Sequence, residues 1–305
     1  MRKTFGSVAL AALLSLALSA CGGQAAAPTA TPAPTSTPAP TATPAPTATP
    51  APPTPDPNAD PAEVFKAAIA RTREAKAYRI NLSFKAKGNL GDSLPTDPSA
   101  APGAEVEIIA VEGEIDGENS HIFLKGFLSA MLGAEPDKGI EFTTVDGKNY
   151  IKGPVAMLQA TEEKWYVLPE GQSSPASGFS SNQLLGSFDE NSNADFSDIK
   201  ATGTEQIDGQ NCTIYTGDKA AVEKAFASSS AGLPTGQLKE ITSAELKIAI
   251  CGDGYFRQMS FFLEGVAEGE TEPVTISFDF RLSDFDGDIK IEAPADAVPI
   301  PTPSN

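Results

Sequence analysis

The sequence predicts an α+β fold, in which a large curved antiparallel β-sheet forms a half-barrel and a few helices cover its apolar concave face. Three observations predict it: long runs alternate apolar and polar residues with a period of two, Asp-Gly pairs separate these runs, and few segments show helical periodicity. Clean alternation means that one face of the sheet is apolar and the other contacts water.

The first twenty residues have the layout of an export signal. Arg2 and Lys3 supply positive charge, residues 8–18 are mostly apolar, and small residues follow. The apolar run is too short to span a ~30 Å hydrocarbon core. We therefore expect a cleaved signal peptide over residues 1–20.

The signal ends in a short motif, Leu18-Ser19-Ala20-Cys21-Gly22. This motif resembles the lipobox of bacterial lipoproteins, in which the cysteine thiol is diacylated and the chain is cut just before it. The resemblance implies a lipid anchor, such as palmitate, on Cys21, at the extracytoplasmic face of a cell membrane. Two or more acyl chains give stable anchoring. The alternative is an ordinary secretory signal followed by a chance cysteine.

A linker follows the cysteine, so that residues 21–57 form the lipidated N-terminus and its spacer. Residues 24–57 are almost entirely Ala, Pro and Thr, a composition that favours extended polyproline II. Fully extended at ~3.1 Å per residue, they reach on the order of 100 Å. The sequence does not decide whether the threonines carry sugars. Proline-rich peptide recognition is the alternative role for the run. Residues 58–305 are long enough for one large domain with a core of its own.

Charge excludes one class of partner. The formal net charge is −18, and removal of Arg2 and Lys3 with the signal peptide would make it −20. So acidic a chain is repelled by nucleic acid and by anionic lipid head groups. We expect membrane contact through the lipid anchor and no nucleic-acid partner.

The domain is expected to open with a helix over residues 60–76. Asp60 is a suitable N-cap, Pro61 suits the first helical position, and Glu63 completes a capping box. The apolar spacing that follows places one face of this helix on the core, namely Phe65, Ala68, Ile69 and Thr72. Further helices are expected near 218–229, and in short pieces around 127–133 and 182–188.

Strands with alternating side chains follow the first helix, clearest over residues 80–86, 246–250 and 274–282. Asp-Gly is the preferred sequence of a tight hairpin turn, in which both central residues take a positive φ. Five such pairs predict five hairpins, at Asp116-Gly117, Asp146-Gly147, Asp208-Gly209, Asp253-Gly254 and Asp286-Gly287.

Over most of residues 60–298 the chain resembles the mycobacterial LppX/LprG lipoproteins. The segments that carry the resemblance are the strand 78–84 after an amphipathic helix, the hairpin 145–152 followed by Lys164-Trp165, Ile207-Asp208-Gly209 leading to Tyr215, the strands in 244–262, and the ending 289–297. That family is similar in fold to the lipoprotein carriers LolA and LolB. The resemblance implies that the domain holds acyl chains of lipids or glycolipids; it identifies no ligand-contacting residue and no protein partner.

Catalytic and metal-binding motifs are weak or missing. His121 is the one histidine, and no nucleophile elbow, histidine metal motif or phosphate loop accompanies it. The acidic run 189–195 has alternating oxygen ligands like a calcium loop, but Ala194 replaces the needed glycine and Lys200 the bidentate glutamate. We expect no enzyme activity, no cofactor and no metal, with the acidic run a solvated loop.

Two cysteines remain besides Cys21. Cys212 and Cys251 both lie in expected strands of the C-terminal half. An exported protein with one remaining pair favours a disulfide between them, and two buried thiols are the alternative.

Apolar side chains that could line a lipid cavity are mostly phenylalanines of the alternating strands, since Phe is much commoner than Tyr or Trp. The candidate set is Phe65, Ile69, Phe84, Phe123, Phe127, Leu128, Met131, Leu132, Phe261, Phe278 and Phe280. A plain packed core is the alternative reading of this set. The apolar stretch 126–133, bounded by glycines, is either a lid over the cavity mouth or a short buried helix.

Two functional hypotheses follow from the sequence. In the first, the domain is a non-enzymatic lipoprotein that binds or carries lipid or amphiphile acyl chains. In the second, the same fold is an envelope interaction or sensor module without a lipid ligand, and its function lies in exposed loops such as 88–104 and 169–193.

Overall fold

The computed structural model describes residues 59–89, 103–158, 160–171, 185, 195–226 and 238–300, all within one unit of the chain, Thr49–Asn305. Their helices and strands, in chain order, are α1 (Pro61–Arg73), β1 (Ala77–Lys87), β2 (Glu105–Asp116), β3 (Asn119–Lys125), α2 (Phe127–Met131), β4 (Ile140–Val145), β5 (Lys148–Lys152), the 3₁₀ turn η2 (Ala156–Leu158), β6 (Trp165–Val167), β7 (Lys200–Ile207), β8 (Gln210–Gly217), α4 (Lys219–Phe226), β9 (Leu238–Cys251), β10 (Phe256–Ala267), β11 (Pro273–Ser283) and β12 (Val298–Pro299).

Helix α1 forms where its end signals predict it. The Asp60 side chain accepts a hydrogen bond from the backbone N–H of Ala62 at 3.0 Å, and Pro61 occupies the first turn. Arg71 and Arg73 lie in the last turn, where positive charge favours the negative end of the helix dipole. The four side chains expected on the core face of this helix are all buried.

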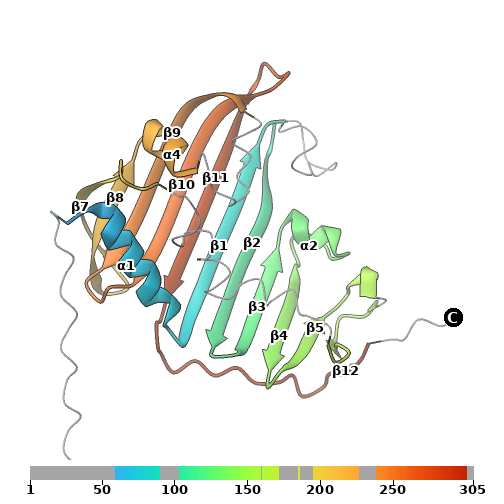
Figure 1. Ribbon diagram of the computed structural model, residues 1–305. Helices are drawn as coiled ribbons and strands as arrows, with labels where there is room; N and C mark the ends of the chain where they lie inside the picture. Colours follow the sequence, from blue (N-terminus) through green and yellow to red (C-terminus); the bar gives the residue numbers. More distant parts are fainter. Residues whose placement is uncertain are drawn as a thin grey trace, which may run out of the picture. The chain divides into compact units, whose positions relative to one another are not determined.

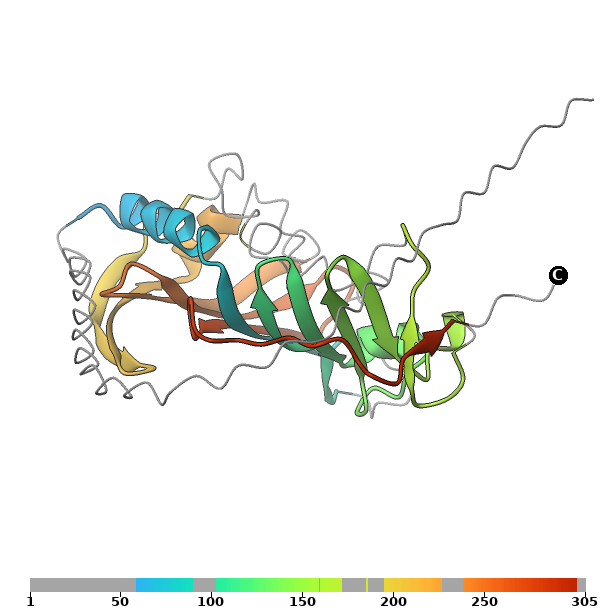
Figure 2. The same ribbon diagram turned by 90° about the horizontal axis from the view of Figure 1, so that it is seen from below.

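The described strands form a single twelve-stranded sheet in the order β12-β6-β5-β4-β3-β2-β1-β11-β10-β9-β8-β7 (Figure 1). Neighbouring strands are antiparallel except β12 and β6, which are parallel. The chain runs outward from β1 to β6, then enters at the opposite edge with β7 and returns to β11, which pairs with β1. In Figure 2, α1 lies on one side of this open sheet. The predicted α+β half-barrel is confirmed.

Four of the five predicted Asp-Gly hairpins are present, at the β2–β3, β4–β5, β7–β8 and β9–β10 turns. In two of them both central residues have positive φ: Asp146 at 49° with Gly147 at 74°, and Asp208 at 51° with Gly209 at 75°. This is the geometry that matches the twist of the flanking strands.

The fifth hairpin prediction, at Asp286-Gly287, is wrong. A return strand would need a free edge of β11, but β1 and β10 already pair with both edges. The chain after β11 instead runs past the lower ends of the strands in Figure 1 to β12, at the far edge of the sheet. This C-terminal crossing segment, residues 284–297, contains no strand.

The predicted helix near 218–229 is present as α4 in its described part, and the piece near 127–133 is the shorter α2. Of the predicted piece 182–188 only Leu185 is described, and it is not helical.

The main hydrophobic core lies on the face of the sheet that carries α1. Its largest fully buried side chains are Tyr78, Tyr215, Phe142, Phe256, Ile122, Leu124, Ile140, Ile151, Leu185, Leu246, Ile248 and Ile250. A smaller buried cluster, of Ile207, Cys212, Ile214, Ala249 and Cys251, is separate from it. In β8 and β9 its members alternate with main-core residues, so this cluster lies on the opposite face.

Candidate functional site

A row of apolar side chains crosses the middle of the core face. Phe261, Phe278, Phe84 and Ile109 pair directly from β10 to β11, β1 and β2, so their side chains share one face. The rings of Phe261 and Phe278 stack with centroids 5.5 Å apart. We call these four residues the central row.

The central row is less covered than the residues above and below it. Phe84, Phe278 and Ile109 are only half-buried. The neighbouring core-face residues of β1 and β11 are buried: Leu82, Ala86, Ile276 and Phe280. Apolar surface is thus accessible at the centre of the sheet, between buried core-face residues of β1 and β11.

Helix α1 covers a different part of this face. It packs on β10, with the Phe65 ring 5.8 Å from that of Phe256 and 4.3 Å from that of Phe196. The Thr72 hydroxyl accepts a hydrogen bond from the backbone N–H of Phe256 at 3.0 Å. Because α4 packs on β8 and β9, the described helices on this side cover chiefly β8–β10 and leave the central row at their margin.

Helix α2 packs against β2 and β3 and is the most exposed apolar segment of the described chain. Leu128 is 39% exposed and Met131 56%, while Leu132, just after the helix, packs against the main core. Gly126 starts the helix with φ 86°, and a Cβ there would lie 2.7 Å from the carbonyl oxygen of Glu107. This close approach holds α2 beside the β2 backbone next to Ile108.

The structure brings most of the sequence-predicted cavity residues to the core side of the sheet. Phe65, Ile69, Phe261 and Phe280 are buried there. Phe84 and Phe278 are half-buried in the central row, and Phe127, Leu128, Met131 and Leu132 belong to α2 and its end. Ile109, which the sequence reasoning missed, completes the row; its alternation with Val111 on β2 was the available signal.

Phe123 lies apart from the other candidates. It pairs with Glu112 and Glu141 on the polar face of the sheet, and the Lys125 ammonium lies 4.6 Å from its ring centroid. Because Ile122, Phe123 and Leu124 are all apolar, the sequence here did not reveal which residues face inward.

The polar face is hollowed around His121. A hollow of about 680 Å³ is lined by residues of β11 and β1–β4, and a second of about 290 Å³ lies against the C-terminal crossing segment. His121 Nε2 is 3.3 Å from a carboxylate oxygen of Glu141, whose other oxygen accepts a hydrogen bond from Lys152 at 2.5 Å. The histidine thus belongs to a polar network that links β3, β4 and β5.

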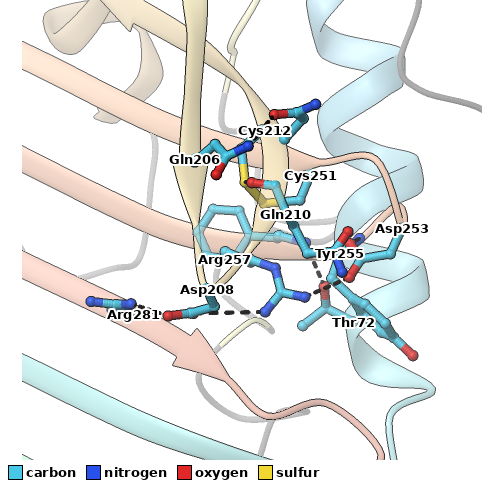
Figure 3. Close-up of a disulfide and its surroundings, with 12 residues drawn as sticks. Thr72, Gln206, Asp208, Gln210, Cys212, Cys251, Asp253, Tyr255, Arg257 and Arg281 are labelled. Carbon is cyan, nitrogen blue, oxygen red and sulfur yellow. Dashed lines mark hydrogen bonds and ion pairs between the residues drawn. A yellow bond between two sulfur atoms is a disulfide. The ribbon is translucent and has the colours of Figure 1, made fainter.

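The predicted disulfide between Cys212 and Cys251 is present and joins directly opposed positions of β8 and β9 (Figure 3). Beside it the Arg257 side chain, only 7% exposed, pairs with Asp253 at 2.5 Å and with Asp208 at 3.8 Å. Asp208 also pairs with Arg281. Ion pairs and a covalent bond therefore hold the β7–β8 and β9–β10 turns together.

Asp286 ties three segments together at the end of α1. Its carboxylate accepts hydrogen bonds from the Lys76 backbone N–H at 2.9 Å and from the Tyr255 hydroxyl at 2.7 Å. Burial and this carboxylate raise the pKa of Tyr255 to about 12. Burial pushes the pKa of Asp286 up, but the hydrogen bonds outweigh it and the pKa lies below the usual 3.8.

The described residues contain no group of three or more His, Cys, Asp or Glu side chains that could hold a metal ion. Of the acidic run 189–195, only Asp195 is described; it caps the backbone N–H of Ser197 and pairs with Lys224. Searching the described part of the chain for a helix long and apolar enough to cross a membrane finds none. Cys21, the linker, and most of the loops 88–104 and 169–193 lie outside the described residues.

Comparisons with known proteins give one family match. A protein-family profile described as "Family of unknown function (DUF7537)" matches residues 4–295. No curated protein sequence matches the chain.

Three solved structures are similar in fold, each over 77% of this chain. The lipoprotein LppX of Mycobacterium tuberculosis is 13% identical over 100% of its own chain, with a TM-score of 0.38. LprF of Mycobacterium bovis is 13% identical over 96% of its chain, with a TM-score of 0.40. A DUF1329 family protein of Desulfovibrio piger is 9% identical over 96% of its chain, with a TM-score of 0.22. LppX, a member of the group of lipoproteins that the sequence resembles, is among these matches.

Proposed function

The chain belongs to the Family of unknown function (DUF7537), and we propose that it is a membrane-anchored extracytoplasmic lipoprotein that binds or carries acyl chains of a lipid or amphiphile. The ligand's acyl chain lies on the central row, and its head group remains at the water-exposed margin. The protein performs no chemistry on the ligand.

The central row carries this proposal. Three of its four apolar side chains are half-buried at the middle of a face where the neighbouring positions of β1 and β11 are buried. An acyl chain laid across β10, β11, β1 and β2 would remove this apolar surface, and its own, from water. Burial is worth ~0.8 kcal/mol for each methylene group, so ten methylenes contribute about 8 kcal/mol before the cost of ordering the chain.

The N-terminal region supports the proposed location. The lipobox-like motif at Cys21 supplies the anchor, and a spacer on the order of 100 Å lets the domain work away from the bilayer surface. The formal charge of −18 favours attachment through the anchor over direct contact with anionic lipids.

Close packing on the same face favours a second candidate function, an envelope interaction or sensor module without a lipid ligand. Ile122, Phe142 and Leu246 are fully buried among their neighbours, as in an ordinary filled core. In that case the half-buried row is only the margin of the core.

A matched pair of phenylalanine substitutions separates the two candidates. Phe84→Gln puts an amide into the central row, whereas Phe262→Gln changes a 42% exposed ring on the opposite face of the sheet. Binding of a fluorescent fatty acid to the full-length protein in detergent would be titrated for each. The proposal expects Phe84→Gln to weaken binding about tenfold or more, since a buried amide without a partner costs ~1–3 kcal/mol, and Phe262→Gln to leave it unchanged. Equal binding by both variants, or no binding by the unsubstituted protein, would favour the second candidate.

A further inference from the structure

The polar face of the sheet contains a trough with no part in the proposed lipid site. Its two hollows, of about 680 and 290 Å³, share Glu114, His121 and Glu141 and therefore lie next to each other. The strands form the floor, and residues 290–292 of the C-terminal crossing segment form part of one wall. Volumes of ~300–1,000 Å³ are typical of small-molecule sites, although most such sites are more apolar than this one.

Most of the charged side chains that line the trough already have an ion-pair partner. Arg79 pairs with Glu114 at 3.0 Å and with Asp284 at 3.2 Å, and Glu141 pairs with Lys152 at 2.5 Å. An ionic ligand would have to displace a partner from one of these pairs. An uncharged ligand with hydroxyl groups would not, because each carboxylate oxygen and guanidinium can make more than one hydrogen bond. The pairing therefore favours a neutral polar ligand.

The acidic side chains of the trough remain accessible to such a ligand. The Glu114 side chain is 34% exposed and that of Glu141 25%. Each carboxylate can accept hydrogen bonds from water in addition to those from its protein partner. A ligand hydroxyl can take the place of that water.

Aromatic rings lie among these polar groups. Trp165 lines the smaller hollow, with its ring centroid 6.4 Å from that of His121, and Phe123 lines the larger. A pyranose ring has a face of C–H groups that packs on an aromatic ring and a rim of hydroxyls that hydrogen-bonds to carboxylates, guanidinium and amide. We propose that this trough binds a neutral oligosaccharide.

The sole tryptophan of the chain gives a direct readout, because it lies in the trough. The full-length protein in detergent would be titrated, with selective excitation of tryptophan, with tetrasaccharides of glucose and of N-acetylglucosamine. A tetrasaccharide of galacturonic acid tests an anionic ligand of similar size. The proposal expects a saturable change of Trp165 emission with at least one neutral sugar and a weaker one, or none, with the anionic sugar.

Two matched carboxylate variants locate the binding. Glu114→Gln changes the trough, whereas Glu245→Gln changes an exposed carboxylate of β9 that lines neither hollow. Glutamine keeps one acceptor oxygen but has no charge, and a hydrogen bond to a charged acceptor is worth ~1–1.5 kcal/mol more than one to a neutral acceptor. Glu114→Gln should therefore weaken binding about fivefold to tenfold, and Glu245→Gln should not change it. His121→Ala, with a side chain already 40% exposed, provides a second trough variant should Glu114→Gln unfold.

Three results would overturn the proposal. They are an unchanged emission with every sugar, equal affinity of the trough variants and the Glu245→Gln control, and a preference for the anionic sugar. Each is independent of lipid binding, because the central row lies on the other face of the sheet.

Discussion

Replacing Thr72 by valine tests how α1 is held on the sheet. Thr72 is fully buried; its hydroxyl donates to the carbonyl oxygen of Ala68 at 2.7 Å and accepts from the backbone N–H of Phe256 at 3.0 Å. Valine has nearly the same shape but no acceptor. The substitution therefore leaves the Phe256 N–H without this partner while the helix keeps its packing.

The size of the effect follows from that one lost acceptor. A buried polar group left unsatisfied costs ~1–3 kcal/mol, so Thr72→Val should lower the free energy of unfolding by about 2 kcal/mol. For a domain of this size, each ~1 kcal/mol shifts Tm by ~2–4 °C, which gives about 4–8 °C. Thr72→Ser keeps the hydroxyl and removes one methyl group, worth ~1 kcal/mol.

Urea unfolding of the full-length protein, followed by circular dichroism, measures both variants. We expect Thr72→Val to be the less stable of the two, with an unchanged dependence on denaturant. If Thr72→Val is as stable as the unsubstituted protein, or more stable than Thr72→Ser, the hydrogen bond does not hold α1 in place.

Two further predictions concern the disulfide drawn in Figure 3 and the Asp286 carboxylate at the end of α1. The Cys212–Cys251 disulfide closes a separation of 39 residues. Replacing both cysteines by serine should therefore lower the free energy of unfolding by about 4 kcal/mol in the chain-entropy model. Reductant should destabilise the unsubstituted protein but not this double variant. A double variant as stable as the oxidised protein would contradict the prediction. Asp286→Asn should destabilise by about 1 kcal/mol at neutral pH, because the carboxylate is exposed and partly screened. Folding lowers the pKa of Asp286, so the carboxylate stabilises the folded protein fully above pH 3.8. This stabilisation is lost as the pH falls through the pKa of Asp286 in the folded protein. If the difference in stability between the unsubstituted protein and Asp286→Asn grows on acidification, Asp286 does not have this role.

Local signals predicted the elements that depend on local chemistry. Asp60 and Pro61 marked the start of α1, and four Asp-Gly pairs marked hairpins whose strands had free edges to pair with. The failed hairpin at Asp286 shows the limit of such signals. β11 has no free edge because it pairs with β1, some 200 residues earlier in the chain. The sequence near Asp286 does not indicate this pairing.

The candidate site could be predicted only in part from the sequence, because it too depends on tertiary packing. Alternation identified the core-face phenylalanines of β1, β10 and β11, but it could not show that Phe84 and Phe278 would be less covered than Leu82 and Phe280. Cover depends on where α1 and α4 pack, which is a tertiary property. Phe123 was assigned to the cavity with the other phenylalanines, but it lies on the polar face of the sheet. The apolar run Ile122-Phe123-Leu124 shows no alternation, so it does not indicate which side chains face the core.

Native mass spectrometry of the full-length protein, recovered from its host membrane in a mild detergent, tests lipid binding most directly. The proposed covalent anchor at Cys21 would add a fixed mass, so a carried lipid would appear as a further adduct that organic solvent removes. We expect such an adduct, and a smaller bound fraction for Phe84→Gln than for Phe262→Gln. A protein that carries only its covalent anchor, and that takes up no added fatty acid, would contradict the proposed function.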